Sequence, residues 1–200
     1  MNLVRMPVAL LLLSLFAIGA TSCGGKKESE ETKSTFGALK EYAEKVEELS
    51  QKEPVEPIAF QELKELLPEK LVGLPRTASE GQGSGNLGFQ VTMAKGTYSD
   101  DEKSLDLDIM DLGGIGGAAT AGLAAWTLAE TERETEDGYE RTIRLDGHKG
   151  FERYNSTYKD AELKIFYNDR FLISLEGNNL SMDEVKSAFR QINLSSLPKN

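Results

Sequence analysis

Apolar and polar residues alternate through most of the second half of the chain. Phe89, Val91 and Met93 interleave with Gln90 and Thr92, which is typical of a strand with one buried face. The same alternation predicts five further strands, at residues 105–109, 139–145, 151–155, 161–167 and 171–176. Tight-turn dipeptides such as Asp-Gly at 146–147 separate the later strands, so we expect neighbouring strands to run antiparallel.

Apolar side chains spaced three and four residues apart predict helices before these strands. Residues 36–49 carry this spacing, and so do residues 59–67, which follow Pro54 and Pro57. We assign both to an N-terminal helical arm, residues 36–80. The glycine-rich stretch at 81–88 then predicts a loop.

Two more helices are predicted within the strand-rich part. Residues 113–131 are rich in Gly and Ala. Near the end of the chain, Ser181 and Glu184 have the spacing of a capping box and precede an amphipathic helix. Residues 86–200 therefore predict an α+β domain. It would hold an antiparallel sheet of about six strands, packed by the Gly/Ala-rich helix and the C-terminal helix and preceded by the helical arm.

The first 22 residues have the three parts of a secretory signal. A short positive start ends at Arg5, residues 7–20 are mostly apolar, and two small residues follow. The apolar stretch is shorter than the roughly 20 residues that span a bilayer. Residues 24–35 contain no apolar side chain, which predicts a flexible tether after the signal.

Residues 20–23, Ala-Thr-Ser-Cys, resemble the lipobox of bacterial lipoproteins, with Ala20 where leucine is usual. The resemblance implies cleavage before Cys23, a diacylglyceryl group on its thiol and a fatty acyl chain such as palmitate on its amino group. Buried acyl chains, at roughly 0.8 kcal/mol per methylene, would hold the protein on a membrane. Gly24 replaces the aspartate that keeps Gram-negative family members at the inner membrane, which implies the outer membrane. The alternative is an ordinary signal peptide that ends at a cysteine by chance.

The charge balance and the cysteine content exclude several classes of site. With 33 acidic and 23 basic residues the net charge is −10, which disfavours nucleic acid and anionic lipid as electrostatic partners. A single cysteine rules out an internal disulfide and a cysteine-based zinc site.

The glycine pattern at 114–119, Gly-Ile-Gly-Gly-Ala-Ala, resembles a dinucleotide-binding fingerprint. That fingerprint requires a parallel βαβ unit, which the predicted meander does not provide. We therefore interpret the segment as a helix whose small residues pack closely on the sheet. A shallow apolar ligand groove beside residues 113–129 is the alternative.

Two other groups of residues could carry chemistry. Asp106, Asp108 and Asp111 suggest calcium, but their spacing does not match the calcium loop, so a solvated strand face is the simpler interpretation. The acidic run at 130–137 is interpreted as the solvent-facing end of a helix. His148, the single histidine, lies in a predicted tight turn, and the chain lacks the Gly-x-Ser-x-Gly motif of hydrolases.

We therefore predict one modified residue, Cys23, and no catalytic residue, cofactor or metal site. The expected function is a membrane-anchored bacterial envelope lipoprotein, lipid-anchored at the outer membrane, that binds an envelope protein or a small apolar ligand and does not bind nucleic acid. The rival is an envelope hydrolase that uses two carboxylates in contrasting environments. The order of elements loosely resembles the PsbP and Mog1 sandwich modules and uncharacterised envelope lipoproteins, a resemblance that implies no activity.

Overall fold

A computed structural model describes residues 37, 39–44, 46–48, 53–86, 89–114, 122, 126 and 129–198. The chain divides into two units, Met1–Ala38 and Leu39–Asn200, and the elements described below belong to the second. Residues 39–44 and 46–48 are helical, as their apolar spacing predicts. No helix among the described residues has the length and apolar character needed to cross a membrane.

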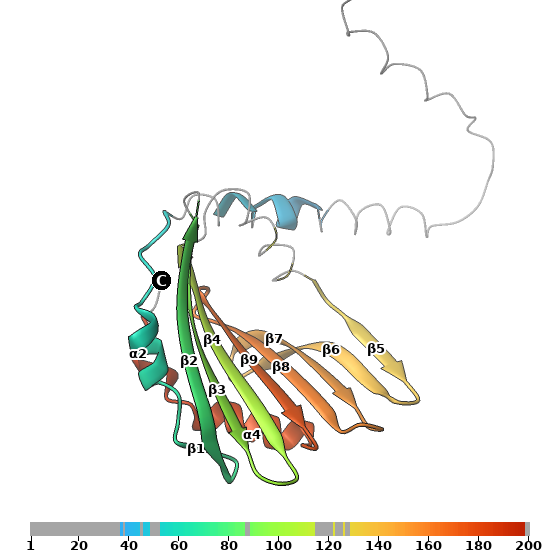
Figure 1. Ribbon diagram of the computed structural model, residues 1–200. Helices are drawn as coiled ribbons and strands as arrows, with labels where there is room; N and C mark the ends of the chain where they lie inside the picture. Colours follow the sequence, from blue (N-terminus) through green and yellow to red (C-terminus); the bar gives the residue numbers. More distant parts are fainter. Residues whose placement is uncertain are drawn as a thin grey trace, which may run out of the picture. The chain divides into compact units, whose positions relative to one another are not determined.

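The described chain forms one antiparallel sheet of nine strands in the order β1-β2-β3-β4-β9-β8-β7-β6-β5 (Figure 1). Two meanders make it up, and the pairing of β4 with β9 joins them. The strands are β1 (Lys70–Leu71), β2 (Leu74–Asn86), β3 (Phe89–Ser99), β4 (Ser104–Gly114), β5 (Glu132–Thr135), β6 (Gly138–Leu145), β7 (His148–Asn155), β8 (Asp160–Tyr167) and β9 (Phe171–Asn178).

Local sequence explains the tight turns of the second meander. Asp146 and Gly147, between β6 and β7, have φ values of 52° and 88°, and Asn168 and Asp169, between β8 and β9, both have φ of 52°. Two successive residues with positive φ are typical of the hairpin turn that Asn, Asp and Gly favour. The predicted turn at 146–147 is confirmed.

One face of the sheet carries the core. Every second residue of the central strands is buried there, as in Leu105, Leu107 and Ile109 of β4. The helix α4 (Met182–Gln191) packs its buried Val185 and Phe189 over β8 and β9, behind the sheet in the view of Figure 1. The shorter α2 (Phe60–Glu65) covers β2 and β3, and the 3-10 turn η1 (Leu194–Ser196) follows α4. We call this side the covered face.

The C-terminal helix forms as predicted. The side chain of Ser181 accepts a hydrogen bond from the backbone N–H of Glu184, and the Glu184 carboxylate accepts one from the Ser181 N–H at 2.8 Å. This reciprocal capping satisfies two N–H groups that the first helical turn leaves free.

The predicted fold class is wrong, because the sheet has nine strands and not about six. Among the described residues, the helices that pack on this sheet are α2 and α4. The predicted loop at 81–88 is mostly strand β2, which also takes in residues 74–80 of the predicted helical arm. Gly81 is needed there, since a Cβ atom at this position would lie 2.6 Å from Cδ2 of Phe60 in α2.

The acidic run at 130–137 contains a strand rather than the end of a helix. Residues 132–135 form β5 at the edge of the sheet, and all four are exposed. Charged residues are common on such an edge because they discourage pairing with another chain. Of the predicted Gly/Ala-rich helix, residues 113 and 114 end β4, Gly122 and Trp126 are helical, and 115–121, 123–125 and 127–128 lie outside the described residues.

Candidate functional site

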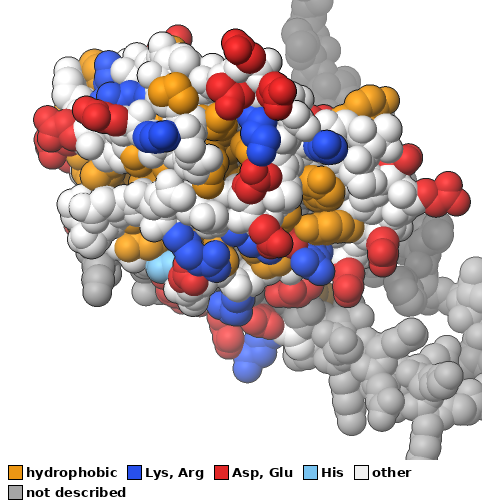
Figure 2. Space-filling model, turned by 90° about the horizontal axis from the view of Figure 1, so that it is seen from below, with side chains coloured by type: hydrophobic (Ala, Val, Ile, Leu, Met, Phe, Trp, Pro, Cys, Tyr) orange, Lys and Arg blue, Asp and Glu red, His pale blue; other side chains and the backbone are white. Residues whose placement is uncertain are grey.

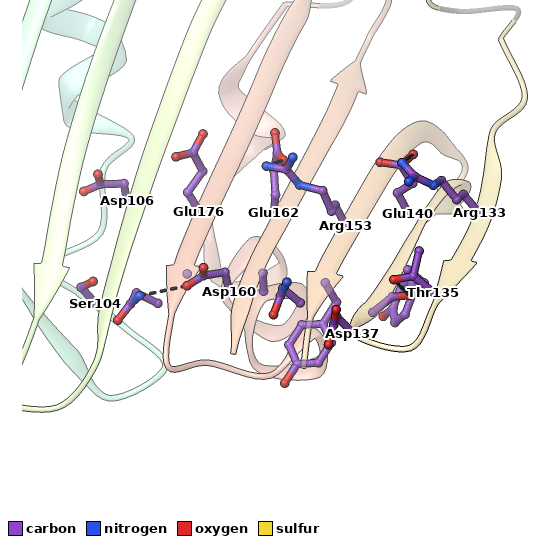
Figure 3. Close-up of a pocket in the computed structure, with 17 residues that line it drawn as sticks. Ser104, Asp106, Arg133, Thr135, Asp137, Glu140, Arg153, Asp160, Glu162 and Glu176 are labelled. Carbon is purple, nitrogen blue, oxygen red and sulfur yellow. Dashed lines mark hydrogen bonds and ion pairs between the residues drawn. The ribbon is translucent and has the colours of Figure 1, made fainter. Parts of the chain in front are cut away.

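The face of the sheet opposite the covered face carries charged side chains at one end of the strands and the apolar row Met110, Leu172 and Phe166 at the other, and we call it the open face. Side chains along a strand alternate between the two faces, so the even-numbered residues of β4, β8 and β9 lie here. A row of charged residues crosses six neighbouring strands on this face (Figure 3). In order from β4 to β5 the row is Asp106, Glu176, Glu162, Arg153, Glu140 and Arg133.

This row lines a hollow of about 640 Å³. A second row borders the hollow toward the ends of the strands, where Nδ2 of Asn178 donates a hydrogen bond to Oδ1 of Asp160 at 2.9 Å (Figure 3). In the view from below, acidic and basic side chains are mixed over the surface with apolar side chains between them (Figure 2). Within the row, the carboxylates of Asp106, Glu176 and Glu162 are neighbours, so negative charge is concentrated at this point of the surface.

The outer two of these three carboxylates are neutralised by partners. Asp106 forms an ion pair with Lys95 at 2.9 Å, and Glu162 forms one with Arg153 at 2.6 Å and another with Lys164. Glu176 lies directly between them in the register of the sheet. Its exposed carboxylate makes no hydrogen bond or ion pair with the rest of the described chain. We call Asp106, Glu176 and Glu162 the acidic strip.

The pKa values nearby reflect this negative charge. The hydrogen bond to Asp106 raises the pKa of Lys95, and the charges of Asp108, Asp106 and Glu176 raise it further. Burial raises the pKa of Asp108, and the neighbouring carboxylates Asp106 and Glu176 act in the same direction against the attraction of Lys95. A cation beside the acidic strip is thus favoured by several carboxylates at once.

The three aspartates considered for calcium do not share a face. Asp106 and Asp108 lie on the open face, whereas Asp111 is fully buried on the covered face. There its carboxylate accepts hydrogen bonds from Nε and Nη2 of Arg170, at 2.8 and 2.7 Å, and from the backbone N–H groups of Ile58 and Gly113. Within the described part of the chain, no three His, Cys, Asp or Glu side chains form a group that could hold a metal ion.

Asp111 and Arg170 instead have a structural role. Nη2 of Arg170 also donates a hydrogen bond to the carbonyl oxygen of Glu56. The pair therefore fastens the chain before α2 to the end of β4 and to the turn between β8 and β9. A second buried carboxylate, Glu152, lies between Arg141 of β6, at 2.7 Å, and Lys186 of α4, at 2.5 Å.

His148 lies at the start of β7, and its ring is stacked at a tilt on Tyr167 with 4.4 Å between the ring centroids. It borders a second hollow, of about 690 Å³, which Glu41, Glu44, Arg144 and Lys149 also line. No Ser or Thr hydroxyl forms a hydrogen bond with the His148 ring in the described residues.

Cys23, the predicted lipidation site, lies outside the described residues, and so do residues 115–119 of the glycine pattern, which we interpret as part of a packed helix. Trp126 is described, and its ring meets Phe166 of β8 edge to face at 5.8 Å between centroids. Because even-numbered residues of β8 lie on the open face, Trp126 lies on that side of the sheet.

Sequence reasoning singled out one member of the acidic strip, Asp106, and neither Glu162 nor Glu176. Asp106 was placed on the polar face of its strand, and Glu162 and Glu176 belong to polar positions of alternating strands. Only the pairing of β4 with β9 brings Asp106 beside Glu176. The alternation was the usable signal, and the order of the strands was the missing part.

No family model, no curated protein and no solved structure matches this chain. The resemblances to bacterial lipoproteins and to the PsbP and Mog1 modules therefore stay predictions from the sequence.

Proposed function

We propose that the protein is a non-catalytic binding module of the bacterial envelope, anchored to the outer membrane by lipid on Cys23, and that its open face binds a positively charged segment of an envelope protein. The observation that carries this proposal is the state of Glu176. It is an exposed carboxylate without a partner in the described residues, and two further carboxylates lie directly beside it.

Like charges that lie opposite each other on neighbouring strands destabilise a sheet. A lysine or arginine from a partner would relieve this repulsion at Glu176 without displacing the ion pairs of Asp106 and Glu162. At the other side of the hollow, Arg153 and Arg133 pair with Glu162 and Glu140. A guanidinium group has five N–H donors, so each can also donate to a carboxylate or a backbone carbonyl of the partner. The volume of about 640 Å³ is sufficient for two or three side chains of such a segment.

The lining also distinguishes this function from the alternatives. A small apolar ligand would bury these charges without compensation, which is unfavourable. A hydrolase would need a raised-pKa carboxylate facing the same cleft as an ionised one. Asp108 is the described carboxyl group whose pKa is raised, and it does not line the hollow. Binding is the function that the geometry supports best.

The binding proposal can be tested with a fluorescent lysine-rich peptide and the full chain in detergent. We expect measurable binding that weakens with added salt, because exposed charges are screened. Glu176→Gln should weaken it by about twofold to fivefold. Glu134→Gln is the matched control, since Glu134 is also exposed but does not line the hollow. Equal effects of the two substitutions would refute the proposal.

The anchoring proposal has its own experiment. Mass spectrometry of the membrane fraction should recover an acylated peptide that begins at Cys23, and Cys23→Ser should release the protein from membranes. An unmodified Cys23 within a longer peptide would contradict this part while leaving the binding proposal intact.

A further inference from the structure

The two edges of the sheet differ in how readily they could pair with a strand of another chain. On one side β5 has four residues, and its exposed Glu132, Arg133 and Glu134 bear charges. On the other side β1 pairs only with Leu74 and Pro75 at the start of β2. Short, charged edges resist pairing with other strands, whereas long, uncharged edges invite it.

The outer side of β2 is the open edge. Beyond Pro75, the N–H of Arg76 donates to the carbonyl of Glu69, and no other described strand borders β2 on this side. Residues 77–85 read Thr-Ala-Ser-Glu-Gly-Gln-Gly-Ser-Gly, and all except the half-buried Gly81 are exposed. This stretch has one charge, Glu80, and neither the lysine nor the proline that commonly protects an edge.

We infer that β2 pairs with β2 of a second copy of this chain, antiparallel and about a twofold axis at Gly81. A β2–β5 contact between copies would run head to tail without closing, and it would be limited by the short, charged β5. Pairing of β2 with itself closes as a dimer. An axis at Gly81 pairs residues 78–84 of the two copies with one another, and all of these lie beyond the bulge between Arg76 and Ala78.

The charges along the edge agree with this register. With a twofold axis at Gly81, a residue that lies n positions before Gly81 is directly opposite the residue that lies n positions after Gly81 in the second copy. Glu80 then lies opposite Gln82 of the second copy, and Ala78 lies opposite Ser84. In this register Glu80 does not lie directly opposite Glu80 of the second copy, so the edge forms no direct like-charge pair.

The dimer would have a consequence for binding. A twofold axis perpendicular to the sheet leaves the open faces of both copies on the same side, so a partner with two basic segments could engage both hollows at once. The pairing itself rests on the edge of β2 and is independent of the proposed function.

Sedimentation equilibrium of the full chain in detergent tests the inference through opposite charges at one position. Gln82→Lys places a cation opposite Glu80 in two symmetry-related pairs and should tighten the dimer by about 2- to 30-fold. Gln82→Glu places a carboxylate there and should weaken it by a similar factor. Ser84→Lys and Ser84→Glu are the matched controls, because position 84 opposes an alanine, and their effects should be alike.

A double variant keeps the inference falsifiable if one variant folds poorly. Adding Glu80→Gln to Gln82→Glu removes the repulsion across the axis without placing a cation opposite Lys95 of β3, and it should recover the dimer that Gln82→Glu weakens. Circular dichroism establishes that each variant remains folded. A wild-type chain that stays monomeric through the micromolar range overturns the inference, and so does a dimer that responds equally to lysine and glutamate at position 82.

Discussion

Two aspartates of strand β4 show how differently the two faces of this sheet use the same side chain. Asp111 on the covered face is fully buried and is held by two nitrogens, Nε and Nη2, of Arg170 and by two backbone N–H groups. Asp106 on the open face has a side chain that is 34% exposed, and it forms an ion pair with Lys95. On the covered face a charge requires complete compensation, and on the open face water supplies part of it.

This difference between the two faces indicates where a partner can bind to the protein. Buried charges such as Asp111 and Glu152 are committed to neighbouring elements and join them together. Glu176, on the open face, lies beside two other carboxylates and has no such commitment among the described residues. Its carboxylate is available to a partner because no hydrogen bond or ion pair within the described residues holds it.

The largest expected effect comes from comparing the same substitution on both faces. Asp111→Asn leaves the buried Arg170 without its counter-charge and should lower the free energy of unfolding by about 3–5 kcal/mol. Asp106→Asn, five residues earlier in the strand, should cost about 0.2–1 kcal/mol. Urea unfolding followed by circular dichroism measures both.

An apolar replacement of the pair extends this test. Asp111→Val combined with Arg170→Met removes both buried charges together and should cost less than Asp111→Asn by itself. If Asp111→Asn and Asp106→Asn destabilised the protein equally, the contrast between the two faces would be wrong.

The second prediction concerns the close contact that lets α2 cover its part of the sheet. Gly81→Ala would place a Cβ atom 2.6 Å from Cδ2 of Phe60 and 2.9 Å from Cδ of Lys64, so we expect a loss of about 1–3 kcal/mol. Gly83→Ala is the control on the same strand and face, because its nearest atom lies at 3.5 Å. Thermal unfolding should separate the two variants, and equal melting temperatures would show that α2 moves away freely.

Gly81 also shows why sequence reasoning found some strands and missed others. The six predicted strands lie within β3, β4, β6, β7, β8 and β9, because alternation along a strand and the residues of a tight turn are local signals. Residues 74–80 of β2 were assigned to the helical arm and residues 81–86 to a loop, since the glycines of β2 leave no apolar alternation. β5 was missed because a charged edge strand buries nothing.

The candidate site depends on information that no single segment contains. Glu162 and Glu176 belong to consecutive strands, so their proximity follows from a hairpin. Asp106 joins them only because β4 pairs with β9, across the whole second meander. Asp111 was grouped with Asp106 and Asp108 because all three are close in sequence, but the alternation of faces separates them and burial near Arg170 gives Asp111 its role.

The third prediction concerns an ion pair that is exposed yet compensated. Hydrogen bonds from Lys103 and from Ser181 lower the pKa of Glu184 from 4.5 to about 2. A carboxyl group whose pKa is lower in the folded protein contributes stability above its unfolded pKa and loses this contribution as the pH falls. Glu184→Gln keeps a residue that the capping box accepts, so it isolates the charge.

We expect the wild type to exceed Glu184→Gln in melting temperature by about 1–3 °C above pH 4.5, since solvent screens the exposed pair. The difference should shrink between pH 4.5 and pH 2 and vanish near pH 2. Differential scanning calorimetry across this range measures it. A difference that stays constant with pH would mean that the side chain acts through packing rather than through its charge.

The smallest effect is the most informative about function, because its sign is reversed. Glu176→Gln removes one of three adjacent like charges and should raise the free energy of unfolding by about 0.2–0.5 kcal/mol. The same substitution should weaken binding of the lysine-rich peptide, so that stability and binding change in opposite directions, as is expected of a residue kept for recognition. Glu134→Gln, on the exposed edge strand β5, should change neither property. High salt should remove the gain in stability, since screening weakens the repulsion in the wild type. A loss of stability in Glu176→Gln would instead show that the carboxylate supports the fold, and the distinction between the faces would then fail at the residue on which the proposed function depends.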